Sequence, residues 1–169
     1  VGVDGTDNGN VFGAARGDKD TDQTDVALVK TTEVTISQAE GKTTYVWGNV
    51  YGGGETGDVG TYYTITEEGA NKGTNAYLGG SGACVVEVTG GTVHHNVFGA
   101  GKGESSKYEC KKAMVSSTDV TIDTNAKVNG NVYGGGEVGR VEYNTVVKIG
   151  SGAGAETGGT SKPEIGGRL

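Results

Sequence analysis

Short alternating runs of apolar and polar residues recur along this chain, separated by glycine-rich stretches. Three of them follow the pattern Thr-x-Val-x-Ile, at residues 32–36, 118–122 and 145–149, and residues 84–88 (CVVEV) are a looser copy. Alternation with a period of two places the Val and Ile side chains on one face of an extended segment. Because β-branched residues are typical of strands, the pattern predicts four short strands, each with one buried face.

A second recurring pattern places Asn and Val before an aromatic residue and a glycine. It occupies residues 9–13, 48–52, 95–99 and 130–134, and a fifth copy begins at residues 165–169. Successive asparagines lie 39 residues apart (10 to 49), then 47 (49 to 96) and 35 (96 to 131), and Arg168 follows Asn131 by 37. Self-similarity at a nearly constant period indicates a repeat architecture.

A third apolar position lies four residues before the valine of each phrase. It is filled by Val46, Val93, Val128 and Ile165, whereas the first unit has Asp7 there. We therefore expect the first coil to be irregular or to act as a cap, because terminal repeats are normally atypical.

These units predict an all-β fold, a β-solenoid, and specifically a right-handed parallel β-helix of four to five glycine-rich repeats. One domain would span residues 1–169, with units starting near Gly9, Gly48, His95, Gly130 and Gly167. A unit is either one coil with a long loop or two short coils, and the pattern favours the first. Almost all the length variation falls between the glycine-rich turn and the Val-x-Ile strand, as loops on one face of a solenoid require. The interrupted fifth phrase predicts a slice of a longer array, or a subunit whose open end a partner completes.

Stacking in register would align equivalent residues into columns. We expect the asparagine amides to bond along the stack and the valines to form its interior. The aromatic rings then point outward, either as a structural ladder over the glycine turns or as a platform for sugars, and the glycines beside them favour the ladder. The columns are Asn10, Asn49, Asn96 and Asn131; Val11, Val50, Val97 and Val132; and Phe12, Tyr51, Phe98 and Tyr133. Arg168 interrupts the asparagine column and leaves the register of the last coil open.

Composition narrows the classes of protein. The 169 residues include 34 glycines without a Gly-X-Y period, which excludes collagen, and the strand-forming clusters argue against a disordered chain. A net charge of −7 disfavours nucleic acid, whose phosphates require a basic surface. No apolar run approaches the ~20 residues of a membrane span, so we expect none in this segment.

One acidic loop has the alternating carboxylates of a calcium site: Asp18, Asp20, Asp22 and Asp25. Gln23 stands where an EF-hand loop needs glycine, and Val29 stands where it needs a bidentate glutamate. A solvated acidic loop is therefore the favoured interpretation, with calcium the alternative and no other cofactor expected. Arg16-Gly17-Asp18 spells an integrin-recognition tripeptide, yet Gly17 is simply the closing glycine of its phrase. His94 and His95 are adjacent, so their side chains would point to opposite faces and would not share a metal ion.

The phrase Gly-Asn-Val-Tyr-Gly-Gly-Gly, together with Thr-x-Val-Thr-Ile, resembles the glycine-rich repeats of large bacterial cell-surface proteins. These look like the right-handed β-helix passenger regions of autotransporter-type adhesins and polymorphic outer-membrane proteins. The resemblance covers Gly9 to Leu169. It implies an extracellular, stalk-like segment that binds a host surface or a glycan, although other proteins with this fold are polysaccharide lyases or hydrolases.

An extracellular location would also bear on the two cysteines. Cys84 and Cys110 are 26 residues apart, and an even cysteine count in such a protein favours a disulfide between them. The acids are scattered through loops without a recurring pair, so no catalytic site is expected. The favoured function is a structural or adhesive segment. The alternative is a fibre subunit that associates end to end, and a carbohydrate-active enzyme is a distant third.

Overall fold

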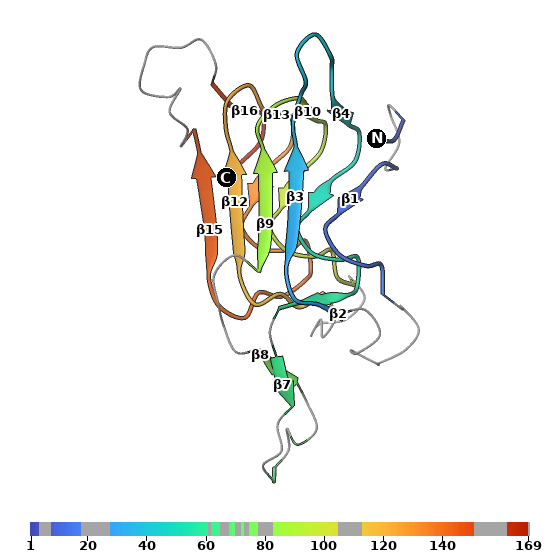
Figure 1. Ribbon diagram of the computed structural model, residues 1–169, viewed down its shortest axis with the longest axis vertical. Helices are drawn as coiled ribbons and strands as arrows, with labels where there is room; N and C mark the ends of the chain where they lie inside the picture. Colours follow the sequence, from blue (N-terminus) through green and yellow to red (C-terminus); the bar gives the residue numbers. More distant parts are fainter. Residues whose placement is uncertain are drawn as a thin grey trace.

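The structure is all-β throughout the part of the chain that it describes. The computed structural model describes residues 1–3, 8–17, 28–60, 62–64, 68–69, 72, 75–77, 83–104, 113–150 and 162–168. Within these ranges the chain forms sixteen strands and no helix (Figure 1). Each strand has two to five residues, and every strand pair except β7–β8 is parallel. The predicted all-β class is confirmed.

The four Val-x-Ile segments form one parallel sheet in the order β15-β12-β9-β3. The strands are β3 (Thr32–Ile36), β9 (Cys84–Val88), β12 (Thr118–Ile122) and β15 (Thr145–Ile149). Equivalent residues pair directly, so Val86 lies between Val34 and Val120. Buried and more exposed side chains alternate along β3, β9 and β12, as the period-two pattern predicts.

Two further parallel sheets consist of two-residue strands. The Asn-Val-aromatic phrases supply β1 (Val11–Phe12), β5 (Val50–Tyr51), β11 (Val97–Phe98) and β14 (Val132–Tyr133). The valine that precedes each later phrase by four residues lies in β4 (Tyr45–Val46), β10 (Thr92–Val93), β13 (Lys127–Val128) and β16 (Glu164–Ile165). Both sheets keep the same residue-to-residue register as the long one.

A fourth column of paired residues was not predicted from the sequence. Strand β2 (Leu28–Val29) pairs with β6 (Asp58–Val59), and single bridges extend the column from Val59 through Val115 to Val141. Val59 and Val115 are fully buried and pack with Cys84 and Ala100 in a small second core. This column lines the corner between the glycine-rich turns and the long sheet.

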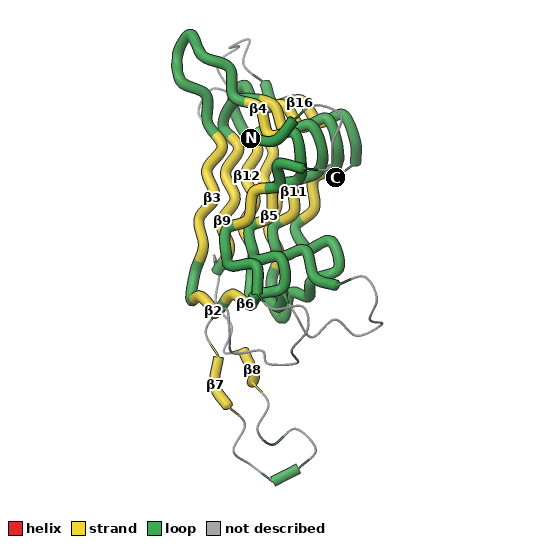
Figure 2. The backbone as a smooth tube through the Cα atoms, turned by 90° about the vertical axis from the view of Figure 1, so that its right-hand side faces the viewer, coloured by secondary structure: helices red, strands yellow, loops and turns green. Residues whose placement is uncertain are grey.

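Each repeat contributes one strand to each of the three four-stranded sheets, always in the same order. We call the strands of one repeat a rung: rung 1 contains β1 to β4, rung 2 contains β5, β6, β9 and β10, rung 3 contains β11 to β13, and rung 4 contains β14 to β16. Figure 2 shows the rungs stacked side by side. A repeat is therefore one turn of chain with its loop, as the sequence favours, and not two short turns.

Extra residues enter the rungs at different corners. In rung 2 the antiparallel hairpin β7 (Tyr62–Thr64) and β8 (Asn75–Tyr77) is inserted before the long strand and projects from the stack (Figures 1 and 2). In rungs 1 and 4, residues 37–44 and 150–163 follow the long strand instead. The expectation that nearly all variation precedes that strand is therefore wrong, because the corner after it also varies, from three residues in rung 2 (89–91) to fourteen in rung 4 (150–163).

The interior is built almost entirely from valine and isoleucine. Rungs 1 to 3 each place two residues from the long strand and one from each short strand into one apolar cluster, whereas the long strand of rung 4 adds only Ile149. In rungs 2 and 3 the core valines and Ile122 are fully buried. Because each rung covers the apolar side chains of its neighbour, the core depends on the stack rather than on any single repeat.

The last glycine of each Asn-Val-aromatic-Gly phrase lies directly against the next rung. A Cβ atom built on Gly13, Gly52 or Gly99 would collide with the carbonyl oxygen of the equivalent glycine one rung further on. The backbones approach too closely here for any side chain, and this contact explains why glycine recurs at the position.

The two ends of the stack differ. At the first end, the backbone of Val1 pairs with β4: the carbonyl of Val1 accepts a hydrogen bond from the Trp47 N–H at 3.0 Å, as Val46 does from His94. Val1 thus takes the column position at which the sequence places Asp7, which lies outside the described residues. At the other end, the inward-facing Val147 of rung 4 is 39% exposed, whereas Val34 of rung 1 is 6% exposed.

Candidate functional site

The asparagine column forms a continuous ladder of hydrogen bonds along the stack. Asn49 Oδ1 accepts from the backbone N–H of Asn96 at 2.9 Å and from its side-chain Nδ2 at 3.1 Å. Asn96 Oδ1 accepts the same pair of bonds from Asn131, at 2.9 and 3.0 Å. The first step uses a backbone donor alone, from Asn49 to Asn10 Oδ1 at 2.8 Å. These side chains are committed to holding neighbouring rungs in register.

Arg168 continues the asparagine ladder through its backbone. Its N–H donates to Asn131 Oδ1 at 2.6 Å, and its carbonyl accepts from the N–H of Val132 at 2.9 Å. The ladder needs a side-chain acceptor only toward the following rung, so an arginine at this position does not shift the register.

The aromatic column is a stack of nearly parallel rings. Phe12, Tyr51, Phe98 and Tyr133 have successive centroid distances of 4.8, 5.0 and 5.0 Å and interplanar angles of 7°, 6° and 12°. Tyr51 is completely buried and Phe98 is 6% exposed, while the last ring, Tyr133, is 40% exposed. The inner rings have no free face to offer a sugar, and the column therefore serves as a structural ladder.

Tyr51 is anchored by its hydroxyl group. The hydroxyl donates to the Glu137 carboxylate and accepts from Asn49 Nδ2 at 3.1 Å. Burial, followed by the contact with Glu137, raises the pKa of the Tyr51 hydroxyl well above its ordinary value. The hydroxyl stays protonated as a donor that ties rung 2 to the loop of rung 4.

Cys84 is a free, fully buried thiol. It lies between Thr32 and Thr118 in the long sheet. Burial raises the pKa of the thiol to about 11, while a hydrogen bond with Thr32 acts in the opposite direction. The predicted partner, Cys110, lies outside the described residues. The Cys84 side chain packs in the interior with Val59 and Ala100, and the disulfide with Cys110 stays a prediction.

The acidic loop proposed for calcium lies outside the described residues, with Asp18, Asp20, Asp22 and Asp25 all in residues 18–27. Across the described ranges, no three His, Cys, Asp or Glu side chains gather closely enough to hold a metal ion.

The two described residues of the Arg-Gly-Asp motif lie at a glycine corner. The Arg16 carbonyl accepts from the Thr56 N–H at 2.8 Å. The Arg16 guanidinium pairs with Glu55 at 3.1 Å, and Lys102 pairs with the same carboxylate at 3.5 Å. Three successive rungs are thus linked by charge at one corner.

The outer face of the sheet β16-β13-β10-β4 carries a group of side chains that the sequence analysis did not single out. Because Val46, Val93 and Val128 point inward, the residues on either side of each point outward. One outward column runs Tyr45, Thr92, Lys127, Glu164, and the next runs Trp47, His94, Asn129. We call these seven residues the outer face of the sheet.

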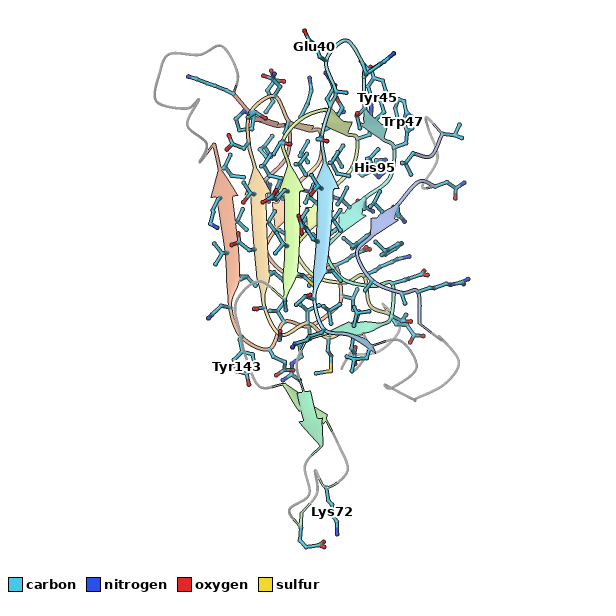
Figure 3. All side chains as sticks on the ribbon, viewed as in Figure 1. Glu40, Tyr45, Trp47, Lys72, His95 and Tyr143 are labelled. Atoms are coloured by element: carbon cyan, nitrogen blue, oxygen red, sulfur yellow. The ribbon has the colours of Figure 1, made fainter. Side chains whose placement is uncertain are left out.

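One end of the outer face is aromatic. Trp47 stacks on His94 with a centroid distance of 3.7 Å and an angle of 26°, and Tyr45 lies 5.6 Å from Trp47 at 22°. Tyr45 is 44% exposed, and Figure 3 shows it beside Trp47 at one corner of the stack. His94 also contacts Asn129, with 3.4 Å between its Nδ1 atom and Asn129 Nδ2, whereas its Nε2 atom is buried without a hydrogen-bond partner. His94 therefore belongs to the aromatic cluster with Tyr45 and Trp47.

The other end of the outer face is polar and borders a cleft. The cleft has a volume of about 320 Å³ and lies at the corner between the long strands and this sheet. Its lining combines Thr92, Lys127 and Glu164 from the outer face with Gln38, Asn125 and Lys162 from the corner loops, besides Gly91 and Ala126. Lys127 Nζ and Glu164 Oε2 form an ion pair at 3.2 Å. Hydroxyl, amide, ammonium and carboxylate groups thus converge beside an exposed aromatic surface.

The outer face could have been found from the sequence by one signal. Tyr45-Val46-Trp47 places two large aromatic residues on either side of an inward valine, so both rings must face outward. Aligned on the glycine phrases, Trp47, His94 and Asn129 already form a column. The long sheet, by contrast, has no aromatic residue on its outward positions.

Comparisons with known proteins do not identify a relative. No family model matches the chain, and neither a curated protein nor a solved structure does. Among the described residues, no helix has the length and apolar character that a membrane crossing needs.

Proposed function

We propose that this chain is a β-solenoid segment, a right-handed parallel β-helix, that serves as a structural and adhesive part of a bacterial surface or secreted protein. In this proposal the stacked rungs form a rigid support, and side chains that face outward from the stack bind a partner molecule. It performs no catalysis in this proposal.

The observation that carries the proposal is the register of the stack. Four repeats place their strands opposite one another without a single shift, and separate ladders of asparagine, aromatic and valine side chains follow the same axis. Contacts of this kind join each rung only to its neighbours, so rungs can be added without changing the architecture. An extended support needs this property.

The alternative of an enzyme has less support. Hydrolysis of a glycosidic bond by the usual route requires two carboxylic acids that flank the bond. The described cleft contains one, Glu164, and it is paired with Lys127. Binding without turnover is the simpler use of this set of groups.

A duplication experiment tests the stacked support. Residues 97–131 constitute one rung, and a second copy inserted after Asn131 preserves the Asn-Val junction. We expect the small-angle X-ray scattering curve to fit a stack that is longer by one strand spacing, about 4.8 Å, in the stacking direction, which runs across the longest axis of the molecule (Figure 1). The insertion separates Tyr51 from Glu137, so we expect the denaturation midpoint to fall only by the effect of losing that one hydrogen bond.

The matched control duplicates only residues 97–114, about half a rung, which places non-equivalent residues opposite each other. This variant should lose stability or fail to fold. Equal behaviour of the two insertions, or unfolding of the full-rung variant alone, would contradict the proposal.

End-to-end association is a second candidate, favoured by the exposed last rung. Val147 and Tyr133 are 39% and 40% exposed on a rung whose strands lie at the edge of all three large sheets. Unpaired edges of this kind recruit further strands, and a head-to-tail contact generates filaments. Sedimentation velocity should then show assembly that grows with concentration and that Val147→Glu suppresses. A monomer at every concentration would remove this candidate.

A further inference from the structure

We propose that the outer face of the sheet β16-β13-β10-β4 binds a saccharide, with Tyr45 and Trp47 stacking on sugar rings and the neighbouring cleft holding their hydroxyl groups. This inference rests on the proposed function, because it names the class of partner that the support would meet. It also identifies a site distinct from the buried aromatic ladder.

The aromatic end of the outer face offers a flat apolar surface in an otherwise polar setting. Tyr45 is 44% exposed although it neighbours Trp47 and lies 5.8 Å from His94. Tyr45 is exposed and the neighbouring Trp47 and His94 are partly buried, so their rings together form one aromatic surface of the kind found at binding sites. One face of a pyranose ring presents only C–H groups, and such a face packs on the negative π-surface of Tyr or Trp.

The polar end supplies what sugar hydroxyl groups require. Each hydroxyl both donates and accepts hydrogen bonds, so it fits best between a donor and an acceptor. Lys127 and Glu164 provide this combination at a separation of 3.2 Å, and Thr92 lies between Lys127 and Tyr45 in the same column. A volume of about 320 Å³ is at the lower end for small-ligand sites, which suits one or two sugar units.

The geometry of the stack also matches a chain of sugars. Successive rungs lie about 4.8 Å apart, close to the length of one pyranose unit in an extended polysaccharide. A saccharide lying across the rungs would therefore meet Tyr45 and Trp47 with one unit and the Thr92 to Glu164 column with the following units. The rigid register holds these contacts in place before binding, which reduces the entropic cost.

Other partners fit this surface less well. A peptide anchored by leucine or phenylalanine needs an apolar pocket, but the cleft lining includes only Ala126 and Gly91 as non-polar residues. Nucleic acid is disfavoured by the net charge of −7. A saccharide uses both the exposed rings and the polar cleft.

Trp47 makes the test direct, because it is the chain's single tryptophan. The full chain would first be screened on an array of defined glycans. Its intrinsic fluorescence would then be titrated with three probes: a β-1,4-linked glucose tetramer, the corresponding N-acetylglucosamine tetramer and a galacturonate tetramer. We expect a saturable change in Trp47 emission with at least one tetramer. Binding of a neutral tetramer would indicate recognition through hydroxyl groups alone, whereas binding of the galacturonate tetramer only would indicate that the charges of Lys127 and Lys162 take part.

Matched variants locate the site. Tyr45→Ala should raise the dissociation constant by up to about tenfold, because one stacked aromatic contact is lost. Lys127→Met should also raise the dissociation constant. Tyr143→Ala removes a tyrosine that is 50% exposed in rung 4, outside the outer face, and should leave affinity unchanged (Figure 3). Circular dichroism of each variant confirms that the fold is retained.

The inference would be overturned if the array gave no signal and no tetramer changed the fluorescence of Trp47. It would also be overturned if Tyr45→Ala and Lys127→Met bound the saccharide as tightly as the parent, or if Tyr143→Ala lost as much affinity as Tyr45→Ala. Binding of a protein or peptide at this face without any saccharide binding would also overturn it. Because the rung duplication is measured by scattering, a failed support and a failed binding site give separate results.

Discussion

Truncation of the central asparagine is the sharpest test of how the rungs are held together. Asn96→Ala removes the Oδ1 atom that accepts two bonds from Asn131 and the Nδ2 atom that donates to Asn49. The backbone N–H of Asn131 is then left without its acceptor at a half-buried position. The substitution changes neither a core valine nor a ring of the aromatic ladder.

The expected loss follows from the number and burial of these bonds. Three hydrogen bonds contribute about 1 kcal/mol each, and an unsatisfied donor inside the protein adds to the cost, so we expect Asn96→Ala to lower the free energy of unfolding by about 2 to 4 kcal/mol. Asn131→Ala removes two bonds, one of them to the exposed Arg168. Its cost should be about half as large, because water replaces the lost acceptor there.

Urea denaturation followed by circular dichroism measures these differences, with the exposed Thr35→Ala as the matched surface control. Hydrogen exchange adds a local readout, since the Asn131 amide should exchange faster in Asn96→Ala while amides of the long strands keep their relative order. A loss below about 0.5 kcal/mol, the range of ordinary surface substitutions, together with an unchanged Asn131 amide, would refute the account of the ladder.

Three more predictions address the close contacts, the buried thiol and the charged corner. Gly53→Ala should lower the free energy of unfolding by about 1 to 3 kcal/mol, because its Cβ would lie 2.7 Å from the backbone nitrogen of Gly101. Gly135 is the same phrase position in rung 4, and a Cβ there meets nothing within 4 Å, so Gly135→Ala should be tolerated. Equal effects of the two substitutions would contradict the close-packing argument. Cys84 should resist a thiol reagent until the protein unfolds, and a rapid native reaction would show that it is not buried. Because folding raises the pKa of this thiol from 9.0 to about 11, the unfolded chain loses the proton first, so stability should fall by about 2 to 3 kcal/mol as pH rises between these values, a slope that Cys84→Ala removes. Glu55→Gln should cost about 1 kcal/mol, less at high salt, and a loss insensitive to salt would argue against a charge effect.

The repeats predicted from the sequence are the elements whose pattern is strictly local. Each of these patterns lies within five consecutive residues: the alternation of the Val-x-Ile segments, and the Asn-Val-aromatic-Gly order of the phrases. Each element can therefore be recognised from its own sequence, without its neighbours. Stacking then follows, because equivalent residues in successive repeats have equivalent backbone conformations. The asparagine and aromatic columns needed no information beyond this.

The features that were missed depend on spacing that varies. Val59 precedes its long strand by 25 residues because a hairpin intervenes, whereas Val115 precedes its strand by three, so no fixed period links the two valines. Val1 replaces Asp7 in its column for the same reason: extra residues separate it from the Asn-Val phrase. The residues of the cleft come from two corner loops as well as the sheet, and only the folded stack brings them together.

Inward and outward positions of the stack differ in how strictly packing limits their residues, and this difference indicates where a binding site could lie. An inward position contacts the rungs on both sides, so valine recurs there from rung to rung. An outward position contacts solvent on one side, and its residue can change without disturbing the stack: Tyr45 is followed in its column by threonine, lysine and glutamate. On the outward positions of the long sheet the same freedom yields acidic residues, threonines, valines and Lys148, which forms an ion pair with Asp119. The rings, amides and charges on the other sheet contact one another between rungs, but the apolar core does not depend on them. Under the saccharide proposal, this freedom is what allows the column to carry groups that meet a partner.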